Sequence, residues 1–278
     1  MKTSRLTLVC ILFTFIAALP AIAGPRTFVS GLGNDANPGT REQPKRTFAS
    51  ALTVTNPGGQ IVALDSAGYG SSTLTIDKSV SIIVPPGVAG FMTVSGASNG
   101  ITINAPSDAV VSLRGLIIET SSSGSGNGIR SNSVGTLTVE DCAIRNFGRG
   151  INFNQANAGH LQVHGGSVRG NTYGIYVSPI APVALDAIVT GSLVENNSTG
   201  FYVNAGNGGP TQLTAAGCTI SGNSTGIHAL GVGGIIRVSD STITDNSTGV
   251  SGSVFSRRNN TLENNANGNS FPGTYSAK

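Results

Sequence analysis

Glu140 and His164 are two residues whose types and spacing could support acid–base chemistry. Each directly follows a valine, Val139 or Val163, at the end of a run in which apolar and polar residues alternate. If these runs are strands of successive coils, the two side chains are outward neighbours ~4.8 Å apart. A carboxylate beside an imidazole can transfer protons to and from a substrate, but the same pair also forms an ordinary cross-strand ion pair. We favour the structural pair and keep the catalytic one open.

Tyr176, Tyr202 and His228 form a second constellation, one suited to binding. Each lies two residues after a glycine that recurs along the sequence. Stacked repeats should therefore place the three rings in one exposed aromatic row. Flat aromatic faces with polar tips suit sugar rings, so the row is a candidate binding surface for a polysaccharide. The alternative, to which we give more weight, is an aromatic ladder that only stabilises an outer sheet.

The acidic residues and histidines do not form a familiar catalytic or metal site. The chain has 13 Asp and Glu residues, and no two of them recur at the same strand position in adjacent repeats, as the paired carboxylates of a glycosidase would require. The three histidines have no second ligand at a spacing typical of zinc. The Asp35-Ala36-Asn37 loop offers oxygens that Ca²⁺ could use, although we favour a capping turn. We expect no metal site and no cofactor, since no motif supports Ca²⁺.

The elements that would position these residues are short strands in a repeat. Asn146, Asn171, Asn197, Asn223 and Asn246 each begin a similar string, and Asn127-Gly128-Ile129 is a weaker copy. The glycines of these strings lie at 128, 150, 174, 200, 226 and 249, a period of 22 to 26 residues. Each period holds three short runs with an alternation of two, which predicts strands. A repeat of this length without helices predicts a solenoid.

The turn residues of the repeat have a structural interpretation. Asparagines at one turn of successive coils can bond to each other as an amide ladder, and the glycine after them would supply a positive φ at a sharp corner. The Asn-Ser-Thr strings also match the glycosylation acceptor pattern, but we favour the ladder. The 39 glycines and the charged fraction of 10% agree with such columns, because a repeated charge would lie close to its own copy.

Cys142 and Cys218 are expected to be separate thiols. They align in a column of small residues with Gly166, Gly191, Ser241 and Asn260. Three coils separate the two cysteines, roughly 14 Å at the spacing of stacked strands. A disulfide needs Cα atoms within about 7 Å, so we expect no bond between them.

Residues 1–23 have the pattern of a signal peptide. A basic start with Lys2 and Arg5 precedes an apolar run, and Ala21 and Ala23 form the small-residue pattern that signal peptidase cleaves. We expect a mature chain from Gly24, secreted or periplasmic, with no membrane span after signal removal. Loss of Lys2 and Arg5 from the 16 basic residues leaves 14 against 13 acidic ones, a net charge of +1. This balance excludes a strongly basic nucleic-acid binder.

The segment before the repeats carries a resemblance to a known family. It contains Gly33-Asn34-Asp35, Asn37-Pro38-Gly39-Thr40 and the run from Leu74 to Val80. Together with the later Asn-x-x-Gly-Ile strings, it resembles the opening of right-handed parallel β-helix proteins of the pectin-lyase-like superfamily. The resemblance implies an all-β, right-handed parallel β-helix solenoid with three short strands per coil and a capping helix at about 44–54. The expected organisation is a signal peptide at 1–23, an N-terminal strand and capping helix at 24–58, the β-helix at 59–270 and a C-terminal tail at 271–278.

The same resemblance leaves the function open, because this fold hosts lyases, hydrolases, esterases, epimerases and non-catalytic proteins. It implies that the sheet with Glu140 and His164 is the substrate face. Our first hypothesis is an exported, non-catalytic protein that binds a polysaccharide or another cell-surface component, or that is structural. The alternative is a lyase, hydrolase or epimerase that acts on uronate-rich polysaccharide with a non-standard site. The scarcity of paired carboxylates favours the first.

Overall fold

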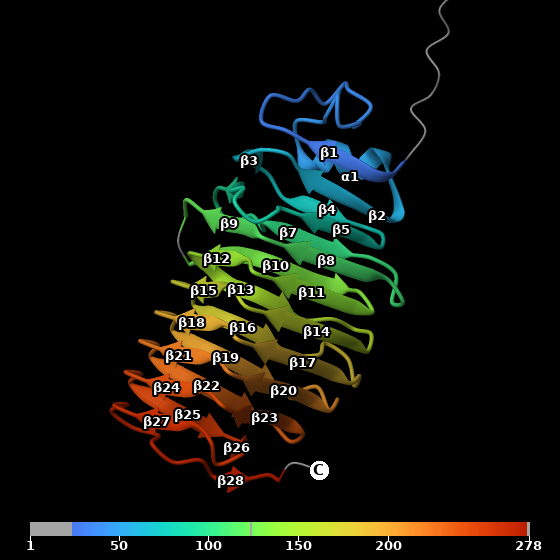
Figure 1. Cartoon of the computed structure of the whole chain (residues 1–278). Helices are drawn as coiled ribbons and strands as arrows, with labels where there is room; N and C mark the ends of the chain where they lie inside the picture. The colour runs from blue at the N-terminus through green and yellow to red at the C-terminus, as the bar shows by residue number, and fades with distance from the viewer. Residues whose placement is uncertain (1–23, 123, 277–278) are drawn as a thin grey trace, which may run out of the picture.

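The chain forms a stack of parallel coils in which each coil contributes one short strand to each of three sheets (Figure 1). The computed structural model describes residues 24–122 and 124–276, so the predicted signal peptide lies outside the described residues. Eight successive strand triplets, from β2–β3–β4 to β23–β24–β25, follow one another along the axis. The predicted parallel solenoid with three strands per coil is confirmed.

The three sheets hold 11, 9 and 8 strands, and we call them sheets A, B and C. Sheet A contains β1 (Gly24–Val29), β2 (Thr55–Ala63), β5 (Val80–Ile83), β8 (Val110–Arg114), β11 (Thr136–Glu140), β14 (Gly159–His164), β17 (Leu185–Thr190), β20 (Thr211–Ala216), β23 (Gly234–Ser239), β26 (Val254–Ser256) and β28 (Gly273–Thr274). Sheet B contains β3 (Ala67–Gly70), β6 (Gly90–Val94), β9 (Leu116–Thr120), β12 (Ala143–Arg145), β15 (Ser167–Arg169), β18 (Leu193–Glu195), β21 (Thr219–Ser221), β24 (Thr242–Thr244) and β27 (Thr261–Glu263). Sheet C contains β4 (Leu74–Ile76), β7 (Ile101–Asn104), β10 (Ser125–Ser133), β13 (Phe147–Phe153), β16 (Tyr173–Val177), β19 (Thr199–Asn204), β22 (Thr225–Leu230) and β25 (Thr248–Gly252).

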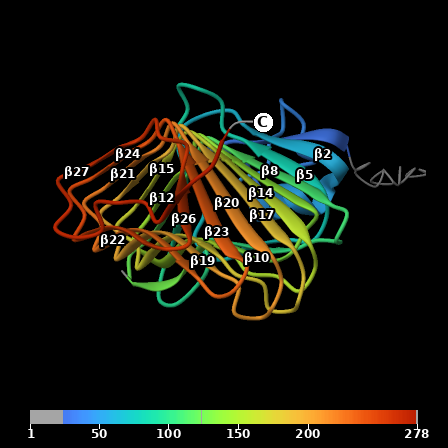
Figure 2. The same cartoon turned by 90° about the horizontal axis from the view of Figure 1, so that it is seen from below.

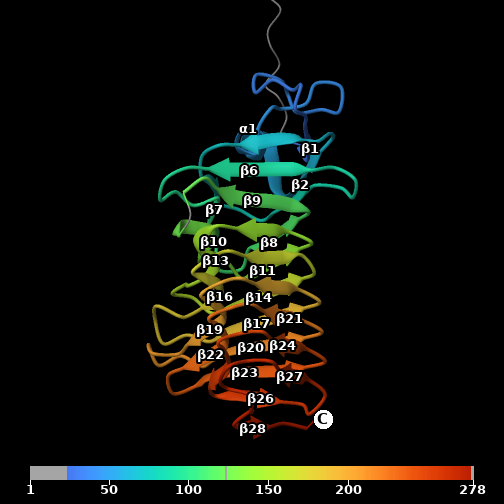
Figure 3. The same ribbon diagram turned by 90° about the vertical axis from the view of Figure 1, so that its left-hand side faces the viewer.

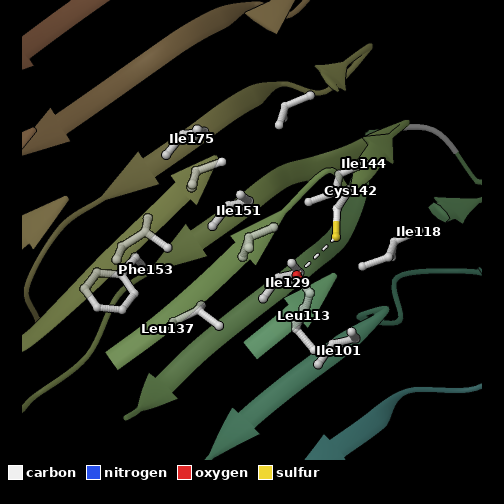
Figure 4. Packing of buried hydrophobic residues seen from close by; sticks show 14 of the residues in the cluster. Ile101, Leu113, Ile118, Ile129, Leu137, Cys142, Ile144, Ile151, Phe153 and Ile175 are labelled. Atoms are coloured by element: carbon white, nitrogen blue, oxygen red, sulfur yellow. Dashed lines mark hydrogen bonds between the residues drawn. The ribbon is translucent and has the colours of Figure 1, made fainter. Parts of the chain in front are cut away.

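The core is one continuous apolar column inside the three sheets. Alternation along strands such as β11 buries every second side chain, so Leu137 and Val139 point inward while their neighbours point out. Equivalent residues of the next coil lie directly beside them, as Leu137 does beside Leu161. Figure 4 shows Leu137 together with other buried side chains of the column, such as Ile129 and Ile151. From the end of the stack, the coils lie one behind another (Figure 2). The outward residues of each strand therefore form columns on the surface.

An asparagine ladder runs along the turn between sheets B and C, as predicted. Each amide donates from Nδ2 to Oδ1 of its copy in the next coil at 2.8–3.0 Å, through Asn171, Asn197, Asn223, Asn246 and Asn265. These side chains are buried, which makes the amides of the Asn-Ser-Thr strings inaccessible as glycosylation acceptors. The prediction for Asn146 was wrong, because Phe147 occupies the ladder position and donates its backbone N–H to Asn171 Oδ1. Buried Phe147 closes this end of the ladder against the apolar core.

The repeated glycines serve close packing between coils, which corrects the expectation of a positive φ. Gly200 is not among the residues with positive φ; Asn196, four residues earlier, has a φ of 54° and makes the corner. A Cβ on Gly200 would lie 2.5 Å from the carbonyl oxygen of Gly226 in the next coil. Only a residue without a side chain allows this backbone approach.

Cys142 and Cys218 are free, buried thiols, as expected. The thiol of Cys142 donates weakly to the carbonyl oxygen of Leu113, 3.5 Å away (Figure 4). The column alignment was wrong at one position, where Ser192 and not Gly191 lies beside Cys218, since Leu193 pairs with Thr219.

The first coil is capped by α1 (Phe48–Val54), which begins four residues later than predicted. Lys45 is held in extended backbone because its N–H donates to Phe28 O and its carbonyl accepts from Ser30 N. The carboxylate of Asp35 accepts hydrogen bonds from the backbone N–H groups of Arg46 and Thr47 and from the Thr47 hydroxyl, in the loop where Ca²⁺ was considered. At the other end, β28 of the tail pairs with β26.

Among the described residues, no helix combines the length and apolar character that crossing a bilayer requires.

Candidate functional site

Glu140 and His164 lie side by side on the outer face of sheet A, as the repeat predicted. Their side chains contact residues on different strands, one on either side of the pair. The Glu140 carboxylate lies 3.7 Å from Nε of Arg114 on one side, and Nδ1 of His164 lies 2.7 Å from the hydroxyl of Thr190 on the other. Each group is thus held in a contact along the sheet, and a catalytic role for the pair stays a prediction.

Sheet A carries further polar contacts between neighbouring coils. His160 and Asp186 are 3.9 Å apart, and Arg237 donates to Gln212 at 2.5 Å. These contacts join side chains of adjacent strands in the manner of cross-strand pairs. Within the described ranges, no group of three or more His, Cys, Asp and Glu side chains is arranged to hold a metal ion.

The predicted aromatic row is present on the outer face of sheet C. Its strands β16, β19 and β22 lie one below another in Figure 3. Tyr176 of β16 pairs with Tyr202 of β19, and Tyr202 pairs with His228 of β22. The tyrosine rings stack with centroids 5.0 Å apart and planes 13° from parallel. The His228 ring meets Tyr202 edge-on, with centroids 5.3 Å apart. All three side chains are half-buried.

Two residues that the sequence reasoning missed complete this row. Tyr173 lies 5.4 Å from Tyr176 and 5.1 Å from Tyr202, both edge-on. The guanidinium carbon of Arg149 lies 4.5 Å from the centre of the Tyr176 ring and 5.6 Å from that of Tyr173. Both residues directly precede a repeated glycine, Gly150 or Gly174, and this shared position was the available signal. We call Arg149, Tyr173, Tyr176, Tyr202 and His228 the aromatic cluster.

The stacking changes which part of the row can meet a ligand. The faces of Tyr176 and Tyr202 are turned toward each other along the axis, and Arg149 lies over Tyr176. A sugar ring stacked flat on these faces would have to displace those contacts. A ligand can therefore reach the ring edges and the hydroxyls more readily than the ring faces. The cluster is better suited to hydrogen bonding with a ligand than to stacking on it.

The polar atoms of the cluster are largely without hydrogen-bond partners among the described residues. Of the tyrosines in the described chain, Tyr69 alone donates its hydroxyl to another residue. Burial, and then the neighbouring hydroxyls of Tyr176 and Tyr173, raise the pKa of Tyr202 above its ordinary value of 10.0. The two described side-chain atoms that are buried without a hydrogen bond, Nε of Arg149 and Oδ1 of Asn152, both lie here, Asn152 being the strand partner of Tyr176. Unsatisfied buried atoms are rare in folded proteins, and their concentration marks this surface.

Comparisons with known proteins agree with the architecture. A family model described as the right-handed β-helix region matches residues 91–237, just over half of the chain. The crystal structure of pectate lyase Pel9A resembles the chain with a TM-score of 0.60 and 16% sequence identity, over 83% of this chain and 68% of that one. No curated protein matches the sequence. At this identity, the likeness concerns the fold alone.

Proposed function

The chain belongs to the right-handed β-helix family, and from that premise we propose that it is an exported, non-catalytic protein that binds a glycan through the aromatic cluster on sheet C. The family alone does not select an activity, since the fold hosts many. The proposal is supported by one observation above the others. Three tyrosine hydroxyls, an imidazole and a guanidinium gather on one surface without partners inside the described chain.

The cluster suits the chemistry of a polysaccharide. Sugars present hydroxyl groups at short intervals, and tyrosine hydroxyls can both donate to them and accept from them. The residues recur from coil to coil, so an extended chain could lie along the axis and meet Tyr176, Tyr202 and His228 in turn. The stacked rings immobilise the hydroxyls in advance, which reduces the entropy cost of binding.

Removal of the two central hydroxyls tests this proposal. The double variant Tyr176→Phe with Tyr202→Phe keeps the stacked rings and removes only the hydrogen bonds. For any polysaccharide that the native chain binds, the affinity of the double variant should be about tenfold or more lower, since two hydrogen bonds contribute roughly 1 kcal/mol each. Affinity electrophoresis through gels that contain each member of a polysaccharide panel measures the effect, with Tyr275→Phe as the matched control. If the double variant and the control migrate equally in every polysaccharide gel, the aromatic cluster is not the glycan-binding surface.

A polysaccharide lyase is the second candidate, supported by the neighbouring Glu140 and His164 on sheet A. The resemblance to a pectate lyase suggests uronate polymers as substrates to test. This candidate expects new unsaturated ends or reducing ends on such a polymer, and their loss in Glu140→Gln or His164→Ala. Absence of product from native protein across the panel would exclude it.

A further inference from the structure

Arg149 lies in the aromatic cluster without an acidic partner. Three other arginines on the outer faces, Arg114, Arg145 and Arg169, are each paired with a glutamate of a neighbouring coil. The described carboxylates form no such pair with Arg149, whose guanidinium lies against the rings of Tyr173 and Tyr176 instead. Aromatic rings attract a cation but do not neutralise its charge. The positive charge of Arg149 is therefore uncompensated at this surface.

The terminal nitrogens of the half-buried Arg149 side chain are not fully enclosed by the protein. Nε is buried without a partner. The two terminal nitrogens make no hydrogen bond to the described residues and are not among the buried unpartnered atoms, so they reach water. A guanidinium presents its terminal N–H groups as a planar fork that matches two oxygens of one anionic group. The fork is available to a ligand.

The groups around the fork are also hydrogen-bond donors. The hydroxyls of Tyr173, Tyr176 and Tyr202 can each donate, and the centroids of their rings lie 5.0–5.4 Å apart. A carboxylate or sulfate accepts several hydrogen bonds at once, whereas a neutral hydroxyl accepts few. The surface therefore matches an acceptor-rich, negatively charged group better than an uncharged sugar.

We propose that the aromatic cluster takes an anionic group of a glycan, a carboxylate or a sulfate, with Arg149 as its charge partner and the tyrosine hydroxyls as further donors. This inference rests on the proposed function and specifies its ligand. It also gives Arg149 a role that stacking alone does not require. The partly buried position strengthens the attraction, because less water surrounds the charges than on an open surface.

A matched series of polymers tests the charge preference. Dextran, carboxymethyl dextran and dextran sulfate share one backbone and differ in the group that they carry. Binding can be followed by tyrosine fluorescence, since the chain has no Trp and three of its five tyrosines lie in the cluster. The native chain should bind at least one charged polymer about tenfold or more tightly than dextran, and added salt should weaken that binding. The comparison of the two charged polymers identifies the preferred group.

Three variants locate the preference. Arg149→Gln should bring the charged polymers to the affinity of dextran, and Arg149→Lys should restore part of the difference. Arg169→Gln, on sheet B, is the matched control and should behave as the native chain. Equal affinity of the native chain for all three polymers, or an unchanged charge preference in Arg149→Gln, would overturn the inference. If a neutral glycan still binds through Tyr176 and Tyr202 in that case, the proposed function stands and only the anionic specificity falls.

Discussion

At the scale of single residues, the cluster and the core use the same side-chain types in different ways. Tyr69 is fully buried, packs against Phe48 and donates its hydroxyl to Asp65. Tyr173, Tyr176 and Tyr202 are half-buried and contact one another through their rings, with hydroxyls that no described residue accepts. The first arrangement stabilises the capped end of the molecule. The second leaves hydrogen-bonding groups for something outside the chain.

The buried thiol of Cys142 gives a prediction on pH. Burial raises the pKa of Cys142 from its ordinary value of 9.0 to about 12. The unfolded chain therefore loses this proton first, so the folded state should lose relative stability as the pH rises from about 9 toward 12. Below the ordinary value, both states are protonated and the thiol makes no difference to the pH dependence. Urea unfolding at about pH 8 and about pH 11 measures this change.

Cys142→Ala is the control for the thiol, because tyrosines and lysines also titrate in this range. The variant should lose less stability between the two pH values than the native chain. The same pH dependence in both proteins would show that the Cys142 thiol does not contribute.

At the scale of the element, each coil depends on close backbone contact with the next one at the start of its sheet C strand. Gly200 illustrates this, since a Cβ there would lie 2.5 Å from the carbonyl of Gly226. Gly200→Ala should destabilise the chain by about 2 kcal/mol or more, because the coils must move apart to accommodate the methyl group. Gly68→Ala is the matched control, since a Cβ on Gly68 meets nothing within 4 Å. Chemical denaturation compares the two, and equal stabilities would contradict the packing role of Gly200.

The sequence predicts strands and ladder well for a physical reason. Leu137, Leu161 and Leu213 recur because stacked coils place equivalent residues in the same environment. The alternation then determines which side chains point outward, and the positions of Tyr176 and Tyr202 follow directly. Because every coil carries the same alternation, each one independently supports the same strand prediction.

The cluster residues that the sequence did not predict depend on side-chain orientation between neighbouring coils. Arg149 and Tyr173 occupy one column, yet they contact Tyr176 in another, and no spacing rule specifies that contact. The step from Gly191 to Ser192 in the cysteine column is likewise set by the strand register, in which Leu193 pairs with Thr219. Such details depend on local backbone geometry, which the apolar alternation does not encode.

At the scale of the whole molecule, the solenoid presents two candidate faces that differ in chemistry. Sheet A carries paired charges such as Glu140 with Arg114, whose groups already satisfy one another. Sheet C carries the aromatic cluster, whose polar groups lack partners in the described chain. An extended polymer could follow either face along the axis of the coils (Figures 1 and 3). We propose that the ligand lies on sheet C.

The three histidines of the chain are natural reporters for the two faces. His160 and His164 lie on sheet A, and His228 lies in the aromatic cluster on sheet C. The imidazole signals can be followed by nuclear magnetic resonance while a polysaccharide that the chain binds is added. This titration distinguishes the two faces directly. We expect the signals of His228 to shift while those of His160 and His164 stay in place. Shifts of His160 or His164 with His228 unchanged would place the ligand on sheet A and contradict the account.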